Sequence, residues 1–215
     1  MRVAYCKVDI CEEEATSEEE LMNLRQLLQL FVNAKHLHLE SARLVSGLDK
    51  GVPMRLPSSS SLLHLEMRGC LPNDDDTGAI AAMSTVLEHA PNLETLSLAF
   101  HPQGHDFGDR PDYIRFSEEE LLDARHLSYN PHSVLATPSA MIPCLNNKVR
   151  EINLMHYQGG TAQRALAKFL LSNAPVIDML WCEFAEGPMW TQFQLMRERE
   201  IEGWLINKSA ETHFA

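Results

Sequence analysis

The sequence predicts an α/β fold of repeated strand–helix units, because one short apolar pattern recurs at nearly constant spacing. The pattern is apolar-x-x-apolar-x-apolar, and its five occurrences have the central residues Leu37, Leu65, Leu96, Ile152 and Leu180. Successive centres lie 28, 31, 56 and 28 residues apart, and the longest gap is twice the shortest. This period is typical of a leucine-rich-repeat solenoid, in which parallel strands line a curved sheet.

One complete unit lies between residues 149 and 182. Residues 149–154 are strand-like, and after a glycine turn Thr161 can accept hydrogen bonds from the first turn of a helix. Apolar residues then recur at helical spacing until Pro175, which prevents the helix from continuing. Residues 176–182 repeat the strand pattern. The expected unit is therefore strand, turn, helix and strand.

The first half of the chain contains the same kinds of element. Residues 2–10 alternate enough to form a strand, and Ser17-Glu-Glu-Glu is a capping box that starts a helix running to about Phe31. Residues 46–61 are rich in glycine, proline and serine, which predicts a loop. Apolar residues at positions 80, 83, 87 and 90 again follow the spacing of a helix.

The second half is less regular. A repeat missing between Leu96 and Ile152 would be centred near residue 124, so the stack should contain five or six units. Residues 101–116 break the pattern and predict a long loop, which is either a contact surface or a tolerated insertion. A last helix is expected over about residues 191–207.

The composition disfavours several classes of protein. The 215 residues are 45% hydrophobic, which is enough for one large domain or two small ones. A net charge of −12 disfavours binding to nucleic-acid phosphates. Five cysteines without paired C-x-x-C spacing favour a reducing compartment, and no apolar run approaches the roughly 20 residues of a membrane span. We therefore expect a cytoplasmic or nuclear protein that binds neither nucleic acid nor membrane.

The best candidate for a metal site is one cluster in the predicted loop. Its members are His101, His105, Asp106 and Asp109, whose imidazoles and carboxylates could converge on an ion. The four residues share no rigid element and have no matched second set of ligands. We therefore expect no metal, no other cofactor and no catalytic residue. The alternative is a small metal-dependent enzyme or a metal-binding protein that uses this loop.

Protein binding is the function that the strand positions favour. Side chains alternate along a strand, so the residues that flank each central apolar residue point away from the core. Among these positions we select as protein-binding residues Glu66, Arg68, Glu151, Asn153, Met179, Trp181 and Glu183. Met179 and Trp181 are the main candidates among them, because both are bulky side chains expected to face solvent and an exposed tryptophan is a common anchor at interfaces. The alternative is that the C-terminal helix, with Trp204, covers Trp181 as the cap of the last repeat.

Several longer segments resemble a known family. His126-Leu-Ser-Tyr-Asn-Pro-His-Ser-Val, Pro143-Cys-Leu-Asn-Asn-Lys-Val-Arg-Glu-Ile-Asn-Leu, Ala167-Lys-Phe-Leu-Leu-Ser-Asn-Ala-Pro and Ile201-Glu-Gly-Trp-Leu are similar to the C-terminal FBD region of plant F-box/leucine-rich-repeat proteins. Phe31-Val-Asn-Ala-Lys-His-Leu-His-Leu-Glu looks like the repeats that precede this region. The resemblance implies a leucine-rich-repeat region over residues 1–116 and an FBD-like region over residues 117–215 that continues and caps the solenoid.

The resemblance also implies a role in ubiquitin ligation. In that family the repeats hold the target, while an F-box placed before the repeats docks the ligase adaptor. No such helical segment is visible before residues 2–10 of this sequence. We therefore expect binding of a protein target, and binding of the ligase adaptor only if an F-box lies upstream.

Overall fold

The computed structural model describes residues 5–10, 32–44, 59–71, 76–101, 135, 141–185 and 188–215. The helix expected at residues 17–31 and the predicted boundary between residues 116 and 117 lie outside these ranges. No helix in the described part is long and apolar enough to cross a membrane.

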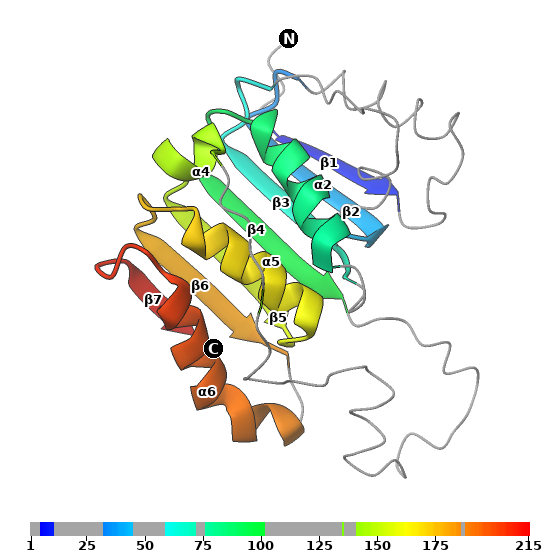
Figure 1. Cartoon of the computed structure of the whole chain (residues 1–215). Helices are drawn as coiled ribbons and strands as arrows, with labels where there is room; N and C mark the ends of the chain where they lie inside the picture. Colours follow the sequence, from blue (N-terminus) through cyan, green and yellow to red (C-terminus); the bar gives the residue numbers. More distant parts are fainter. Residues whose placement is uncertain are drawn as a thin grey trace, which may run out of the picture.

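The fold is α/β, and its described strands form one open, all-parallel sheet (Figure 1). The strands follow one another across the sheet in sequence order. Their bounds are β1 Tyr5–Ile10, β2 His36–Arg43, β3 His64–Cys70, β4 Thr95–His101, β5 Glu151–Tyr157, β6 Met179–Phe184 and β7 Glu211–Phe214. Consecutive parallel neighbours need a crossover connection each time, which explains the long spacing between strands.

The predicted register is confirmed. Leu37, Leu65, Leu96, Ile152 and Leu180 are successive Cα partners across β2 to β6. The last four are buried, whereas Leu37 is partly buried and packs against the edge of the core. Apolar side chains at these positions point inward because strand residues alternate between the two faces. The repeated pattern therefore marks one row of the core.

The structure decides one open question about the strands and adds a strand that was not expected. β4 pairs directly with β5, so no strand centred near residue 124 lies between them. The apolar residues near position 124 do not form the complete pattern, and Ile152 takes the place beside Leu96. The sheet also continues past β6 into β7, which the sequence did not predict because Phe214 is the only large apolar residue of that strand. The sheet thus runs through both predicted regions.

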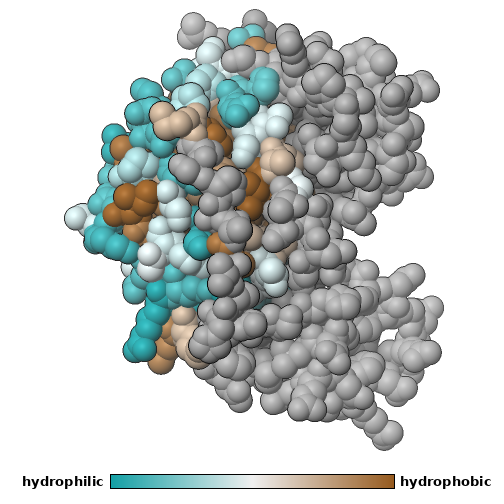
Figure 2. All heavy atoms as spheres, in the orientation of Figure 1, coloured by the Kyte–Doolittle hydropathy of each residue, from teal (hydrophilic) through white to brown (hydrophobic). Residues whose placement is uncertain are grey.

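The described helices cover one side of the sheet (Figure 1). They are α2 Asp76–Glu88, α4 Pro143–Asn147, α5 Thr161–Ser172 and α6 Pro188–Trp204. The core lies between these helices and the strands, with α2 packed on α5 and α5 packed on α6. Figure 2 shows this helical side from outside, where hydrophilic residues predominate on the described surface. The last helix begins and ends about three residues earlier than expected.

The turn into α5 differs in one detail from the prediction. Gly160 is the N-cap residue, and Thr161 makes no capping hydrogen bond. The Gln163 side chain instead accepts hydrogen bonds from the backbone N–H groups of Gln158 and Gly159, at 2.8 and 3.1 Å. Gly159 has a φ of 79°, and a Cβ there would come within 2.9 Å of Arg197 Nε. This turn therefore requires glycine both for its backbone conformation and for its space.

A row of aromatic rings closes the core at the carboxyl ends of the last four strands. Phe100, Tyr157, Phe184 and Phe214 form successive contacts, with ring centroids 6.1, 6.2 and 6.0 Å apart. Offset and edge-on contacts of this kind add to the stabilisation from burial. Phe214 belongs to this row, which explains how a strand with one large apolar residue is held at the edge.

Candidate protein-binding face

The side of the sheet opposite the helices is called the open face here, because no described helix covers it (Figure 1). Burial alternates along β3 and β4, so every second side chain of these strands points to the open face. All the residues selected from the sequence lie at such positions: Glu66, Arg68, Glu151, Asn153, Met179, Trp181 and Glu183. The structure therefore places them on one surface, spread from β3 to β6.

Trp181 lies exposed on the open face. It is 41% exposed, and the neighbouring Met179 is 37% exposed. Its indole stacks on the imidazole of His213 from β7, with ring centroids 5.5 Å apart and an interplanar angle of 29°. Trp204 packs against the core on the other side of the sheet, beside the buried Ile201 of α6. The alternative, in which the C-terminal helix covers Trp181, is therefore wrong.

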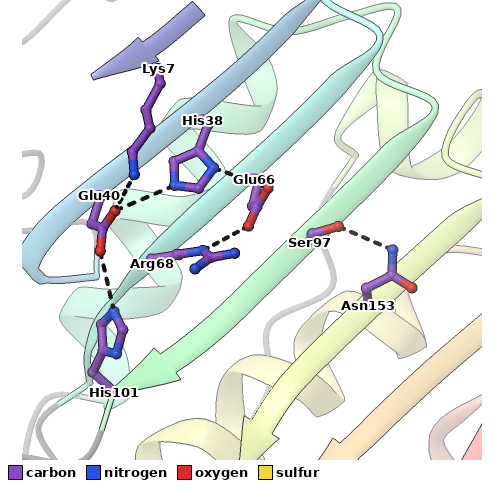
Figure 3. Close-up of polar contacts among 8 residues, drawn as sticks. All are labelled: Lys7, His38, Glu40, Glu66, Arg68, Ser97, His101 and Asn153. Atoms are coloured by element: carbon purple, nitrogen blue, oxygen red, sulfur yellow. Dashed lines mark hydrogen bonds and ion pairs between the residues drawn. The ribbon is translucent and has the colours of Figure 1, made fainter. Parts of the chain in front are cut away.

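The half of the open face formed by β1 to β4 carries a charged network, which we call the glutamate network (Figure 3). Lys7 Nζ lies 2.9 Å from a Glu40 carboxylate oxygen, and Arg68 Nε donates to Glu66 Oε1 at 2.7 Å. The buried His38 ring lies between the two carboxylates, 3.1 Å from Glu66 through Nδ1 and 3.6 Å from Glu40 through Nε2. Each carboxylate therefore has a cationic partner on its own or a neighbouring strand.

The Lys7–Glu40 contact affects how both groups titrate. The hydrogen bond from Lys7 holds the pKa of the Glu40 carboxyl below its ordinary value. The same hydrogen bond and the negative charge of Glu40 raise the pKa of Lys7. Each group therefore favours the charged form of the other, as expected for an ion pair. The pair links β1 to β2 across the open face.

A stacked pair of histidines lies beside this network. The rings of His36 and His64 are parallel within 3°, with centroids 4.2 Å apart, and the two residues are cross-strand partners. Burial lowers the pKa of His36 below its ordinary value, and the positive charges of His64 and Lys35 lower it further. The neutral imidazole is thus the favoured form at this position.

The half of the open face formed by β5 to β7 is organised around Trp181. We call Met179, Trp181 and His213, with the surrounding carboxylates of Glu151, Glu183 and Glu211, the tryptophan patch. Asn153 Nδ2 donates to Glu151 at 2.8 Å and to Ser97 Oγ of β4 at 3.0 Å. His156 Nδ1 lies 3.3 Å from Glu183, and His213 Nε2 lies 2.9 Å from Glu211. Asn153 therefore connects this patch to the other half of the face.

His156 owes its position to an irregularity in β5. Its φ of 55° lies in the left-handed region, and the register between β5 and β6 shifts between Leu154 and Tyr157. A non-glycine residue in that region is strained, and such strain is often found near functional sites. The shift leaves His156 exposed and beside Glu183, while Tyr157 turns into the core.

The metal cluster expected from the sequence is mostly outside the described residues. Only its first member, His101, is described, and its Nε2 atom lies 3.9 Å from Glu40 (Figure 3). His105, Asp106 and Asp109 lie outside the described ranges. Within those ranges, no three histidine, cysteine, aspartate or glutamate side chains are placed to hold a metal ion.

The described buried thiols are poorly suited to nucleophilic chemistry. Burial raises the pKa of Cys144 to about 11, and its Sγ donates to the carbonyl oxygen of Leu87 at 3.3 Å. Burial also raises the pKa of Cys182 far above its ordinary value. A thiol held protonated in this way is a weak nucleophile.

Sequence reasoning missed four residues that define the open face. Lys7, His38, Glu40 and His213 were not selected, although they make its cross-strand contacts. A signal for His38 and Glu40 was available, since they occupy the repeat positions equivalent to those of Glu66 and Arg68, their direct partners across β2 and β3. His213 had no such signal, because β7 itself was not predicted.

Comparison with known proteins finds no matching family model, no matching curated protein and no matching solved structure.

Proposed function

We propose that this chain is a non-catalytic protein-recognition module of the leucine-rich-repeat type, which binds a protein target through its open face. One observation carries the proposal. The described helices all lie on one side of the sheet, and the other side presents a half-exposed tryptophan beside a half-exposed methionine. Large apolar side chains on a surface otherwise lined by polar ones are typical of an interaction site.

Three features support the repeat architecture. The strands are parallel and follow sequence order, their central residues share one register, and α2 and α5 pack side by side on the same face. Proteins built from stacked repeats use the exposed side of the stack as an extended binding surface. The resemblance to F-box/leucine-rich-repeat proteins further supports a role as the target-binding part of a ubiquitin-ligase receptor in the cytoplasm or nucleus.

The energetics favour Trp181 as the centre of binding. Its ring is held by the stacking contact with His213, so little side-chain freedom would be lost when a partner covers it. Truncation of such an anchor in a desolvated interface weakens binding by about 2 kcal/mol or more. The same truncation should leave the fold almost intact, because the ring lies outside the core.

The test compares two pairs of exposed apolar residues on opposite sides of the molecule. The open-face variant is Met179→Ala with Trp181→Ala, and the control is Leu195→Ala with Met196→Ala on α6, where Leu195 is 66% and Met196 43% exposed. We expect proteins captured by the wild type from a cell extract to be lost with the open-face variant and kept with the control. The melting temperatures should be similar for all three. Equal capture by the two variants would contradict the proposal.

A further inference from the structure

The two halves of the open face differ in how their carboxylates are neutralised. In the glutamate network, Glu40 lies against Lys7 and Glu66 lies against Arg68. In the tryptophan patch, and among the side chains that the structure describes, Glu151 contacts the Asn153 amide, while Glu183 and Glu211 contact only imidazoles. Among the described residues, no lysine or arginine lies within ion-pair distance of these last three carboxylates. The patch therefore carries negative charge that the described part does not balance.

The strand register places these carboxylates around one exposed ring. Glu151 of β5 and Glu211 of β7 are the two cross-strand partners of Met179. They therefore lie on either side of β6, two positions before Trp181, and Glu183 lies two positions after it. Neighbouring strands are about 4.8 Å apart, and two residues along a strand span about 6.6 Å. A charged group above the indole is thus within reach of carboxylates on three strands.

We propose that the tryptophan patch binds an arginine or lysine side chain of the protein target, with the cation over Trp181 and between the carboxylates of Glu151, Glu183 and Glu211. This inference rests on the proposed function and specifies the chemistry of the partner. The indole face attracts a cation through its quadrupole, and the aliphatic stem of the same side chain can lie on Met179. Arginine fits best, because its planar guanidinium stacks on a ring and bonds two carboxylates at once.

Other chemistries fit the patch less well. A phosphorylated or acidic segment would bring its charge against three carboxylates, which is strongly unfavourable in a desolvated interface. A purely apolar segment would cover Trp181 and Met179 but would bury those carboxylates without a partner, at a cost in free energy. A cationic side chain can make a cation–π contact with the ring and ion pairs with the carboxylates at the same time. The glutamate network offers no such subsite, because Lys7 and Arg68 already occupy its carboxylates.

The experiment selects peptides from a random library displayed on phage, with the whole chain as bait. We expect the enriched peptides to share an arginine or lysine. One enriched peptide is then synthesised together with a version in which that cation is replaced by glutamine, and both are titrated by fluorescence anisotropy. The replacement should weaken binding about tenfold or more, and so should Trp181→Ala in the chain. Added salt should weaken binding of the peptide that carries the cation, but not binding of its glutamine version.

Charge variants of the chain separate this inference from the function on which it rests. Glu183→Gln with Glu211→Gln should weaken binding of the cationic peptide about tenfold. The control is Glu202→Gln, which changes an exposed residue of α6 on the helical side and should leave this binding unchanged. Enriched peptides that lack a cation but still depend on Trp181 would overturn the inference and leave the proposed function standing. Failure to enrich any peptide that depends on Trp181 would overturn both.

Discussion

The two halves of the open face use equivalent strand positions, yet their polar side chains do different things. On β1 to β4, lysine, arginine and histidine side chains bind glutamates of the same or a neighbouring strand, and the ring of His38 is buried between two of these glutamates. On β5 to β7, the corresponding positions hold an exposed tryptophan and methionine, and among the described residues the carboxylates there contact an amide or imidazoles rather than lysine or arginine.

The difference shows that a position in the repeat does not by itself identify a binding residue. Cross-strand pairs of opposite charge stabilise the pairing of strands, and the glutamate network has that arrangement. A charged side chain that already forms an ion pair within the chain contributes little further free energy when a protein partner binds. Glu66 and Arg68, which the sequence suggested as binding residues, bind one another, so Trp181 and the carboxylates around it are the better candidates.

The largest expected effect tests whether the two halves share one sheet. Leu96 lies in β4, at the seam between them, and has no exposed surface. We expect Leu96→Asp to unfold the chain, because an unpaired buried charge costs several kcal/mol. Ser97→Ala, one residue further along the same strand, removes only the acceptor for Asn153 and should cost about 1 kcal/mol. Thermal unfolding followed by circular dichroism measures both, and an unchanged melting temperature for Leu96→Asp would show that the register is wrong.

The next effect contrasts an ion pair under the helices with one on the open face. The Arg164 guanidinium is 1% exposed and binds the Glu200 carboxylate of α6 through two of its nitrogens, with Nε at 3.1 Å from Oε2. We expect Glu200→Ala to lower the free energy of unfolding by about 3 kcal/mol, because it removes the carboxylate from a buried cation. Lys7→Gln on the open face should change the melting temperature little, since exposed pairs contribute little. Equal effects in chemical denaturation would mean that the Arg164–Glu200 pair is not part of the core.

Much of the sheet could be predicted because its core row is apolar in every repeat. Leu65, Leu96, Ile152 and Leu180 must face inward, and alternation then fixes the direction of their neighbours. Alternation also places Trp181 on the outward side of β6, but only the structure shows that the C-terminal helix leaves it exposed. β7 could not be predicted in the same way, because its pairing with β6 and the contact of Phe214 with Phe184 hold it in place.

The chemistry of the site was harder to predict than its position. The sequence shows that Glu40 and Glu66 face outward, but it does not show that Lys7 reaches Glu40 from β1. It also does not show that His213 stacks on Trp181, since this contact depends on an unpredicted strand. The turn into α5 is a similar case, because a side-chain rotamer decides that Gln163, rather than Thr161, accepts hydrogen bonds from backbone N–H groups of this turn.

The smallest expected effect concerns pH and tests whether the β1 to β4 half is a packed, structural surface. The pKa of His36 is lowered by burial, and also by the nearby His64 and Lys35. The unfolded chain therefore binds a proton that the folded chain resists, so the free energy of unfolding should fall as the pH drops through about 6.5, the ordinary value for histidine. In His36→Gln the fall in melting temperature between about pH 7.5 and about pH 5.5 should be smaller than in the wild type. His64→Gln should give an intermediate slope, because it removes a neighbouring charge but leaves burial, the larger cause. If His36→Gln keeps the full slope of the wild type, the stacked pair does not resist protonation, and this half of the face is more open to solvent than the contacts of His36 indicate.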